Sequence, residues 1–263
     1  MTHRPSIPVP EECRAAIRAG ALVALSTSGG KDSQAMTVLL SRIVPRDQLV
    51  AVHAPLAGVE WPGTIEHIRA TLPSGVPLIL APVSSGKTLL DRVEERGMWP
   101  SNKARWCTSD HKRSPIEREL RRFLKAHPRF GGRIVSAMGM RAEESAARAR
   151  KPAWGLNERN SRAGRTWFDW LPLRDLTEHE VFDVIRDAGQ VPHPAYGLGM
   201  SRLSCVFCIM ASRADLATAA RLQPELYREY CALERRIGHT LSPSGVPLPE
   251  ITGVPASHGK SRT

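Results

Sequence analysis

The 263-residue chain has no long uninterrupted run of apolar residues. A membrane-spanning helix needs about 20 such residues, so the sequence predicts no membrane span. The first residues, MTHRPSIPVPEEC, also lack the apolar core of a signal peptide. We therefore expect a cytoplasmic protein with no membrane partner. Hydrophobic residues make up 41% of the chain, which suffices for a folded core and excludes wholesale disorder.

Lysine is scarce, so the positive charge comes mainly from arginine. Only seven of the 37 Lys and Arg residues are lysines, and 26 Asp and Glu residues leave a net charge of +11. Arginine forms bidentate contacts to phosphate that lysine cannot form. A genome rich in arginine codons would give the same totals, but many arginines gather at 105–122 and 141–165. This clustering favours a nucleic-acid partner.

Cysteine is also scarce, and the five residues are Cys13, Cys107, Cys205, Cys208 and Cys231. An odd number in a cytoplasmic protein argues against a disulfide framework and favours metal or redox chemistry. Cys205 and Cys208 form a C-x2-C pair, which can place two thiolates on one metal ion. A closed tetrahedral site needs two more ligands, and Cys107 and Cys231 are available. This spacing permits either zinc or an iron-sulfur cluster.

Short apolar runs alternate with segments of helical periodicity up to about residue 140. These runs lie at 21–26, 49–53, 76–83 and 133–140. The alternation predicts an α/β fold, Rossmann-like, with a mostly parallel sheet and helices on both faces. Helices predicted in the C-terminal part lie at 177–188, 213–222 and 224–237.

The predicted organisation is a core, a helical region and a tail. We expect a nucleotide-binding core at 1–140, a helical substrate region with cysteine ligands at 141–240 packed on that core, and a flexible tail at 241–263. The stretch 141–166 has no sustained apolar periodicity, and we expect it to be mobile without a ligand.

A further helix is predicted to begin at Ser114, where Pro115 and Glu117 complete a capping box. One face of this helix is basic. We interpret that face as solvated, with a phosphate-contact surface as the alternative. Its basic residues are Arg118, Arg121, Arg122 and Lys125.

The strongest motif is Ser28-Gly29-Gly30-Lys31-Asp32-Ser33, between the first apolar run and the first long helix. Two glycines allow a sharp turn, and the amides at a helix start form an anion site. Ligands of open parallel sheets bind beyond the carboxyl ends of the strands. The motif therefore predicts a phosphate-binding loop.

The string SGGKDS resembles the signature of the PP-loop ATP pyrophosphatase superfamily. Four further segments, in order, resemble its phosphoadenosine phosphosulfate reductase family: VHAPLAGVEWPGT, WPSNKARWCTSDHKRSPIE, GMRAEESAARAR and HPAYGLGMSRLSCVFC. The likeness covers about residues 20–237 and is closest to the iron-sulfur branch that includes the DNA phosphorothioation sulfurtransferase. One departure is Pro55, which stands where that branch has an acidic residue and leaves the role of that carboxylate open.

The resemblance implies roles for individual residues. It implies nucleotide binding by Ser26, Ser28, Gly29, Gly30, Lys31, Asp32, Ser33, His53, Gly139 and Arg141. Of these, the expected catalytic residues are Lys31, Asp32, Ser33 and Arg141. The implied ligands of a [4Fe-4S] cluster, with zinc as the alternative, are Cys107, Cys205, Cys208 and Cys231. Expected contacts to substrate phosphate are Arg105, Lys112, Arg113, Glu144, Ser145, Arg148 and Arg202.

The resemblance also implies an activity. We expect an enzyme that uses ATP with Mg²⁺ to adenylate a substrate oxygen and then supports sulfur transfer, with DNA or tRNA as the acceptor. A cysteine desulfurase or another sulfur donor is an expected partner. The alternative is a sulfonucleotide reductase, but the segment after Cys231 lacks the cysteine nucleophile that such enzymes carry. A second alternative is a nucleic-acid-binding accessory protein that senses ATP.

Overall fold

The computed structural model describes residues 7–256, which form two compact units. Unit 1 comprises residues 7–53, 63–81 and 116–193. Unit 2 comprises residues 54–62, 82–115 and 194–256. Each unit is described by itself below.

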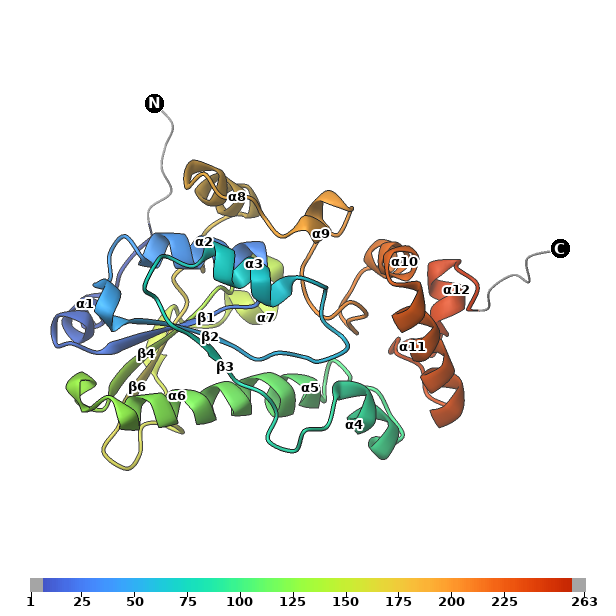
Figure 1. The fold of residues 1–263 in the computed structure, drawn as a ribbon, viewed down its shortest axis with the longest axis horizontal. Coiled ribbons are helices and arrows are strands. Elements are labelled where there is room, and N and C mark those ends of the chain that lie inside the picture. Colours follow the sequence, from blue (N-terminus) through green and yellow to red (C-terminus); the bar gives the residue numbers. More distant parts are fainter. Residues whose placement is uncertain (1–6, 257–263) are drawn as a thin grey trace. The chain divides into compact units, whose positions relative to one another are not determined.

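Unit 1 is built on a six-stranded sheet with the strand order β3-β2-β1-β4-β6-β5 (Figure 1). All neighbouring strands are parallel except β5, which is antiparallel to β6. The strands are β1 (Leu22–Ser26), β2 (Leu49–His53), β3 (Leu78–Leu80), β4 (Arg133–Met138), β5 (Trp154–Leu156) and β6 (Thr166–Trp170). This arrangement confirms the predicted mostly parallel sheet.

Both faces of the sheet are buried, because side chains alternate between two separate cores. On β1, Val23 and Leu25 pack into one core, whereas Leu22 and Ala24 pack into the other. The first core contains residues of α1, α2 and α8, and the second contains Leu120 of α6. Figure 1 shows α2 and α6 on opposite faces of the sheet. The predicted covering of both faces is thus confirmed.

The helices of unit 1 follow the strands as the alternation predicts. They are α1 (Glu11–Arg18), α2 (Lys31–Leu40), α3 (Thr64–Thr71), α6 (Ser114–Ala126), α7 (Ala146–Ala149) and α8 (Glu178–Asp187). Residues Ser114 and Pro115 of α6 are assigned to unit 2. On α8, Thr177 and Glu180 form the capping box that the sequence indicates.

Unit 2 is helical around an aromatic core. Trp99 stacks on Tyr230 with ring centroids 5.0 Å apart, and Phe207 packs against Tyr230 at 4.9 Å. Its helices are α4 (Leu89–Arg96), α5 (Trp106–Thr108), α9 (Pro194–Gly197), α10 (Arg213–Leu222), α11 (Pro224–Ile237) and α12 (Leu248–Thr252). The helical C-terminal part is therefore confirmed.

The structure differs from the expected flexible tail at α12. Glu234 of α11 accepts hydrogen bonds from the backbone N–H groups of Leu241 and Leu248, at 2.7 and 3.0 Å. The Leu248 side chain is fully buried. A buried carboxylate and an apolar anchor therefore hold a segment whose Pro, Gly and Ser content predicts a loose chain. The last seven residues of the expected tail lie outside the described residues.

Strands β5 and β6 are missing from the sequence prediction, which treats 141–166 as irregular. Trp154 and Phe168 stack across the two strands with centroids 4.8 Å apart. Strand β6 also pairs with β4 along its whole length. Tertiary pairing therefore supplies the order that periodicity does not show.

The described residues include no helix with both the length and the apolar character that a membrane span requires. The division of the chain at residues 140 and 240 stays a prediction.

Leu120 tests the contribution of the α6 face to stability. Its side chain is fully buried in the second core, so Leu120→Ala leaves a cavity and is expected to lower the free energy of unfolding by about 2–5 kcal/mol. Leu156→Ala is the matched control, because this leucine of the same unit is 54% exposed, and it is expected to cost under about 0.5 kcal/mol. Urea unfolding measures both. An equal loss of unfolding free energy in both variants would show that Leu120 of α6 does not contribute to the second core as assigned.

Candidate nucleotide loop and cysteine pocket

The predicted phosphate loop lies directly after β1 and ends at the first turn of α2. Gly29 has a φ of +74°, which glycine adopts without strain. Ser33 Oγ donates to the carbonyl of Gly30 at 2.9 Å and accepts from the N–H of Ser28 at 3.1 Å. These bonds close a small ring. The loop is thus preformed, with the positive end of the α2 dipole beside it.

Lys31 is buried among carboxylates rather than projecting into solvent. Its Nζ lies 3.2 Å from Asp32 Oδ2 and 3.1 Å from Glu178 Oε1. Its side chain is only 5% exposed. A buried ammonium group requires such partners, because an unpaired charge is costly to remove from water.

The segment after β4 is anchored on the phosphate loop. Arg141 Nε donates to Asp32 Oδ1 at 2.6 Å, and the guanidinium also pairs with Glu143. At Gly139, an added Cβ would lie 2.9 Å from the carbonyl carbon and oxygen of Asp32. Only glycine allows this close backbone approach. The structure therefore brings together Lys31, Asp32, Ser33, Gly139 and Arg141.

Glu144, Ser145 and Arg148 form a local cap around α7. Glu144 accepts a hydrogen bond from the Arg141 N–H at 2.8 Å and pairs with Arg148. Ser145 Oγ accepts from the Arg148 N–H at 3.3 Å. Arg141 and Arg148 are thus paired with carboxylates in this structure, and their contact with phosphate stays a prediction.

His53 and Ser26 end the two strands beside the loop. The His53 ring is buried, and its Nδ1 lies 2.9 Å from the Thr27 carbonyl oxygen. Because a carbonyl only accepts, Nδ1 carries the proton in this contact. Ser26 is the last residue of β1 and pairs in register with Val52 and Met138. Both residues therefore support the loop from the carboxyl edge of the sheet.

Three of the predicted metal ligands lie in one pocket of unit 2. Cys107, Cys205 and Cys208 line a cavity of about 80 Å³. Interaction with Cys205 raises the pKa of Lys112 more than burial lowers it, and Cys208 and Cys107 add to the increase. Burial raises the pKa of Cys205 to about 11, although Lys112 opposes this. The three sulfurs thus share one electrostatic environment with an ammonium group.

The predicted basic residues around the cysteines divide between two cavities. Arg105, Lys112 and Arg202 line the cysteine pocket. Arg113 instead lines a neighbouring cavity of about 460 Å³ with Arg105. All four were predicted to contact substrate phosphate, and their positions leave this role as a prediction.

Cys231 does not line the pocket that the other three cysteines share. It is buried on α11, where burial raises its pKa and a hydrogen bond with Tyr227 opposes that rise. Within residues 7–256, no three His, Cys, Asp or Glu side chains are grouped to hold a metal ion. The predicted four-cysteine set is therefore not assembled, and the geometry does not support a [4Fe-4S] cluster or zinc there.

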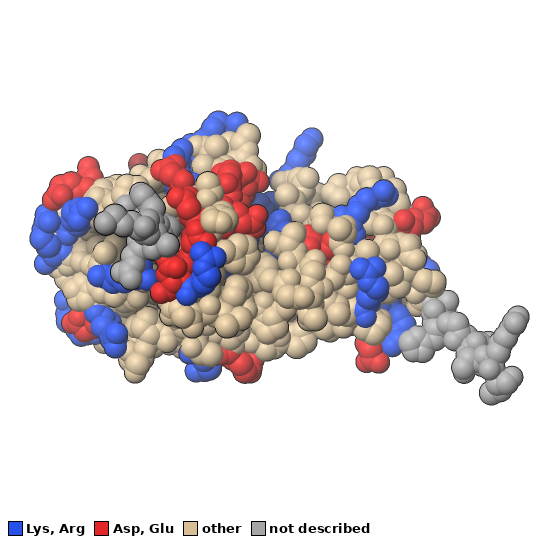
Figure 2. All heavy atoms as spheres, turned by 90° about the horizontal axis from the view of Figure 1, so that it is seen from above, with Lys and Arg blue, Asp and Glu red and all other residues tan. Residues whose placement is uncertain are grey.

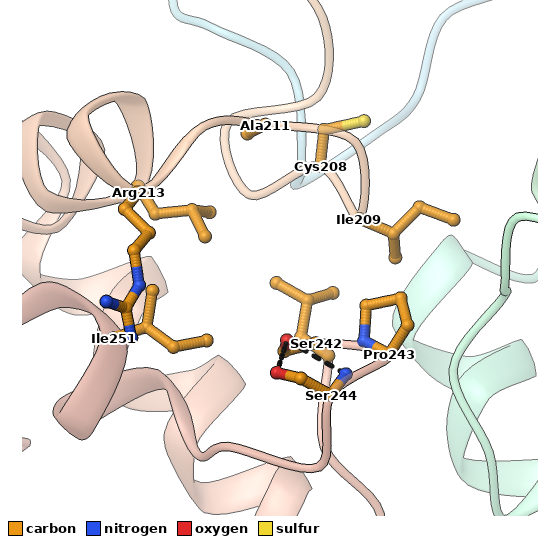
Figure 3. Close-up of a pocket in the computed structure, with 10 residues that line it drawn as sticks. Cys208, Ile209, Ala211, Arg213, Ser242, Pro243, Ser244 and Ile251 are labelled. Atoms are coloured by element: carbon orange, nitrogen blue, oxygen red, sulfur yellow. Dashed lines mark hydrogen bonds between the residues drawn. The ribbon is translucent and has the colours of Figure 1, made fainter.

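Cys208, together with Ile209 and Leu241, lines both the cysteine pocket and a second cavity of about 240 Å³. Figure 3 shows this second cavity, where the Cys208 sulfur is directed away from Ser242 and Ser244. The two serine hydroxyls are hydrogen-bonded to each other at 2.7 Å. The thiol of Cys208 is thus not directed at these hydroxyls.

Two residues of the nucleotide site were not foreseen from the sequence. Glu178 contacts Lys31, and Glu143 contacts Arg141 as well as the N–H of Glu178 at 2.8 Å. Both stand in helical segments where a carboxylate ordinarily faces solvent. Only the acidic start of α8 after its Thr177 cap distinguishes Glu178 in the sequence.

Comparison with known proteins gives the family. Residues 22–211 match the phosphoadenosine phosphosulfate reductase domain. The chain therefore belongs to this family of PP-loop proteins.

Two curated relatives share moderate identity with this chain. An uncharacterized 37.8 kDa protein of Escherichia phage 186 is 29% identical over 196 residues, which cover 74% of this chain and 56% of the relative. An uncharacterized protein of Methanocaldococcus jannaschii is 24% identical over 219 residues, which cover 81% of this chain and 48% of the relative. The chain thus spans about half the length of the curated relatives it matches.

Solved structures are more distantly similar. A phosphoadenylyl-sulfate reductase from Candida auris, in a phosphate complex, has a TM-score of 0.47 at 15% identity, covering 76% of this chain and 98% of that one. An FMN adenylyltransferase from Candida glabrata, in complex with FAD and pyrophosphate, has a TM-score of 0.46 at 13% identity. The match covers 78% of this chain and 68% of that one.

Gly139 provides a test of the loop geometry. Gly139→Ala places a methyl group against the Asp32 backbone and must displace the loop, which costs about 1–3 kcal/mol. We expect the dissociation constant for ATP to rise roughly tenfold, as measured by calorimetry. Gly155→Ala is the control, because a Cβ there has no neighbour within 4 Å in the described structure. Unchanged ATP affinity in Gly139→Ala would contradict the assigned contact.

Alkylation tests the cysteine geometry. Cys13 and Cys205 are buried, and burial raises their pKa values to about 12 and about 11. A thiol of pKa 11 is about one-thousandth thiolate at pH 8, so both are expected to react slowly with iodoacetamide and faster as the pH rises. Partly exposed Cys208 is expected to react first. Peptide mass spectrometry measures the order, and early labelling of Cys205 would contradict it.

Proposed function

We propose that the protein is an ATP pyrophosphatase that adenylates an oxygen of a nucleic acid and supports sulfur transfer to the activated position. The observation that carries this proposal is the preformed SGGKDS loop at the start of α2, in a chain of the phosphoadenosine phosphosulfate reductase domain family. A loop at a helix start can accept the pyrophosphate that departs from ATP.

The proposed first step is in-line displacement at the α-phosphorus. An acceptor oxygen forms a bond to that phosphorus while the bond to the bridging oxygen of the β-phosphate breaks and pyrophosphate leaves. Negative charge grows on the leaving group, and the amides of the loop and Lys31 stabilise it. A sulfur nucleophile then displaces AMP from the activated position.

Carboxylates around Lys31 make a divalent cation necessary for this step. A polyphosphate that reaches Lys31 also meets Asp32 and Glu178, which contact the ammonium at 3.2 and 3.1 Å. Mg²⁺ carried with ATP lowers the resulting repulsion and neutralises charge on the phosphates.

Unit 2 supplies thiols for the sulfur step. Cys107, Cys205 and Cys208 line one pocket with Lys112 and Arg202, and these cations favour an anionic sulfur group. We propose that this pocket receives sulfur from a cysteine desulfurase or a similar donor. No step of the proposal passes through a metal cluster.

Release of labelled pyrophosphate tests the first step. Ser33→Ala removes the hydroxyl that closes the loop, and Lys31→Ala removes its cation, so each is expected to slow release by about 10²–10³-fold. Ser41→Ala is the control, because its hydroxyl bonds only to the Val38 carbonyl at the other end of α2 in the described structure. Release unaffected by Ser33→Ala and Lys31→Ala would contradict the role of the loop.

Two further outcomes would favour other functions. The family match keeps a sulfonucleotide reductase as the second candidate. Sulfite and adenosine bisphosphate formed from phosphoadenosine phosphosulfate with thioredoxin would replace the proposal with that activity. ATP binding without pyrophosphate release, even with DNA or tRNA present, would instead identify an accessory protein that senses ATP. An anaerobic iron and sulfide assay, if positive, would show that the protein holds an iron-sulfur cluster.

A further inference from the structure

A basic groove lies in unit 1, away from the nucleotide loop. Its volume is about 630 Å³, and it lies between α6 and the segment that connects β5 to β6. No acidic side chain is among the described residues that line it. Those residues are Arg118, Arg121, Arg122, Leu124, Lys125, Gly132, Ala163, Gly164 and Arg165.

The groove is held open by specific contacts. Arg121 donates to Asn160 Oδ1 at 3.0 Å, and Arg159 pairs with Glu117, so two links join α6 to the β5–β6 connection. At the floor, a Cβ on Gly132 would lie 2.6 Å from the carbonyl oxygen of Gly164. The walls are therefore positioned by the fold rather than by flexible side chains alone.

Glu117 and Glu119 of α6 are each shared between two arginines. Arg118 and Arg122 share one carboxylate, that of Glu119, at 2.8 and 2.9 Å. The buried Nε of Arg165 has no hydrogen-bond partner within the part of the chain that the structure describes. Shared carboxylates leave the groove with an excess of positive charge, which attracts anions.

The α2 side of the unit 1 sheet, opposite α6, carries charges of both signs. Figure 2 shows the face on the side of α2 and α8, where acidic and basic side chains are interspersed. The groove lies on α6, which covers the opposite face of the sheet. The lining of the groove, by contrast, contains basic side chains and no acidic one among the described residues, on a chain whose net charge is +11.

The residues that line the groove favour a double-stranded over a single-stranded nucleic acid. Proteins that hold single strands stack the bases on aromatic side chains, and none of the described residues that line the groove is aromatic. Arginine-rich surfaces contact the phosphates of a duplex without stacking. We propose that this groove binds the phosphate backbone of double-stranded DNA.

The position of the groove relates it to the nucleotide loop. Gly132 and Arg165 directly precede β4 and β6, whereas the phosphate loop follows the carboxyl end of β1. The six residues of β4 separate the two ends by roughly 20 Å, about six base-pair steps along a duplex. This inference deepens the proposed function, on which it rests for the identity of the acceptor. The groove holds the duplex at a distance from the reacting phosphate.

Binding of a 30-base-pair DNA duplex to the full-length protein without ATP tests the groove. The variant Arg122→Ala with Lys125→Ala removes two exposed cations, so the slope of log K against log salt is expected to become shallower by about 1.8, and affinity at 150 mM salt to fall at least about tenfold. The matched control is Arg42→Ala with Arg69→Ala, which removes the same charge from exposed sites on α3 and after α2. We expect the control to retain most of its affinity and salt slope. Fluorescence anisotropy gives both quantities.

The outcomes separate the groove from the reaction. Equal losses in both double variants would show that net charge alone attracts DNA, and tighter binding of single strands or an RNA duplex would overturn the assignment. Thermal unfolding confirms that each variant is folded. If the groove variant loses DNA while no protein releases pyrophosphate, the groove stands and the proposed function fails. If pyrophosphate is released but the groove variant binds DNA normally, the proposed function stands and the groove assignment fails.

Discussion

The contact between Arg141 and Asp32 joins two loops that are more than 100 residues apart in the sequence. Its 2.6 Å distance and the burial of Arg141, only 4% exposed, make it a charge pair that neither partner can leave without cost. Gly139 extends this contact, because its missing side chain lets the backbone of the β4 loop rest on Asp32. The shape of the phosphate loop thus depends on parallel pairing between β1 and β4.

Carboxylates hold both buried cations of the loop, Lys31 and Arg141, before any ligand enters. Lys31 and Arg141 are both paired with carboxylates, so a simple anion gains little by displacing them. A ligand that brings its own divalent cation can keep these pairs and add new ones. Any anion that enters the loop must therefore compete with carboxylates for both cations.

The sequence predicts local features of this protein better than distant ones. The phosphate loop, β1 and the cap of α8 depend on neighbouring residues, and all three follow from turn and capping chemistry. Strand β6 and the partners of Lys31 depend on contacts far along the chain. Glu178 has the character of an ordinary surface carboxylate until the packing of α8 against α2 brings it to the loop. Periodicity holds no information on such contacts.

The cysteines and the arginines of α6 both show that sequence spacing alone does not predict contacts between distant parts of the chain. A C-x2-C spacing fixes Cys205 and Cys208 together, but the distant thiols join them only if the fold permits, and Cys231 faces Tyr227 instead. The arginines of α6, in contrast, have the pattern of a solvated helix face. They line a groove only because the β5–β6 connection, which the sequence does not reveal, forms the opposite wall. A charged helix face therefore becomes one wall of a groove through its neighbour, and that neighbour belongs to an element formed by tertiary pairing.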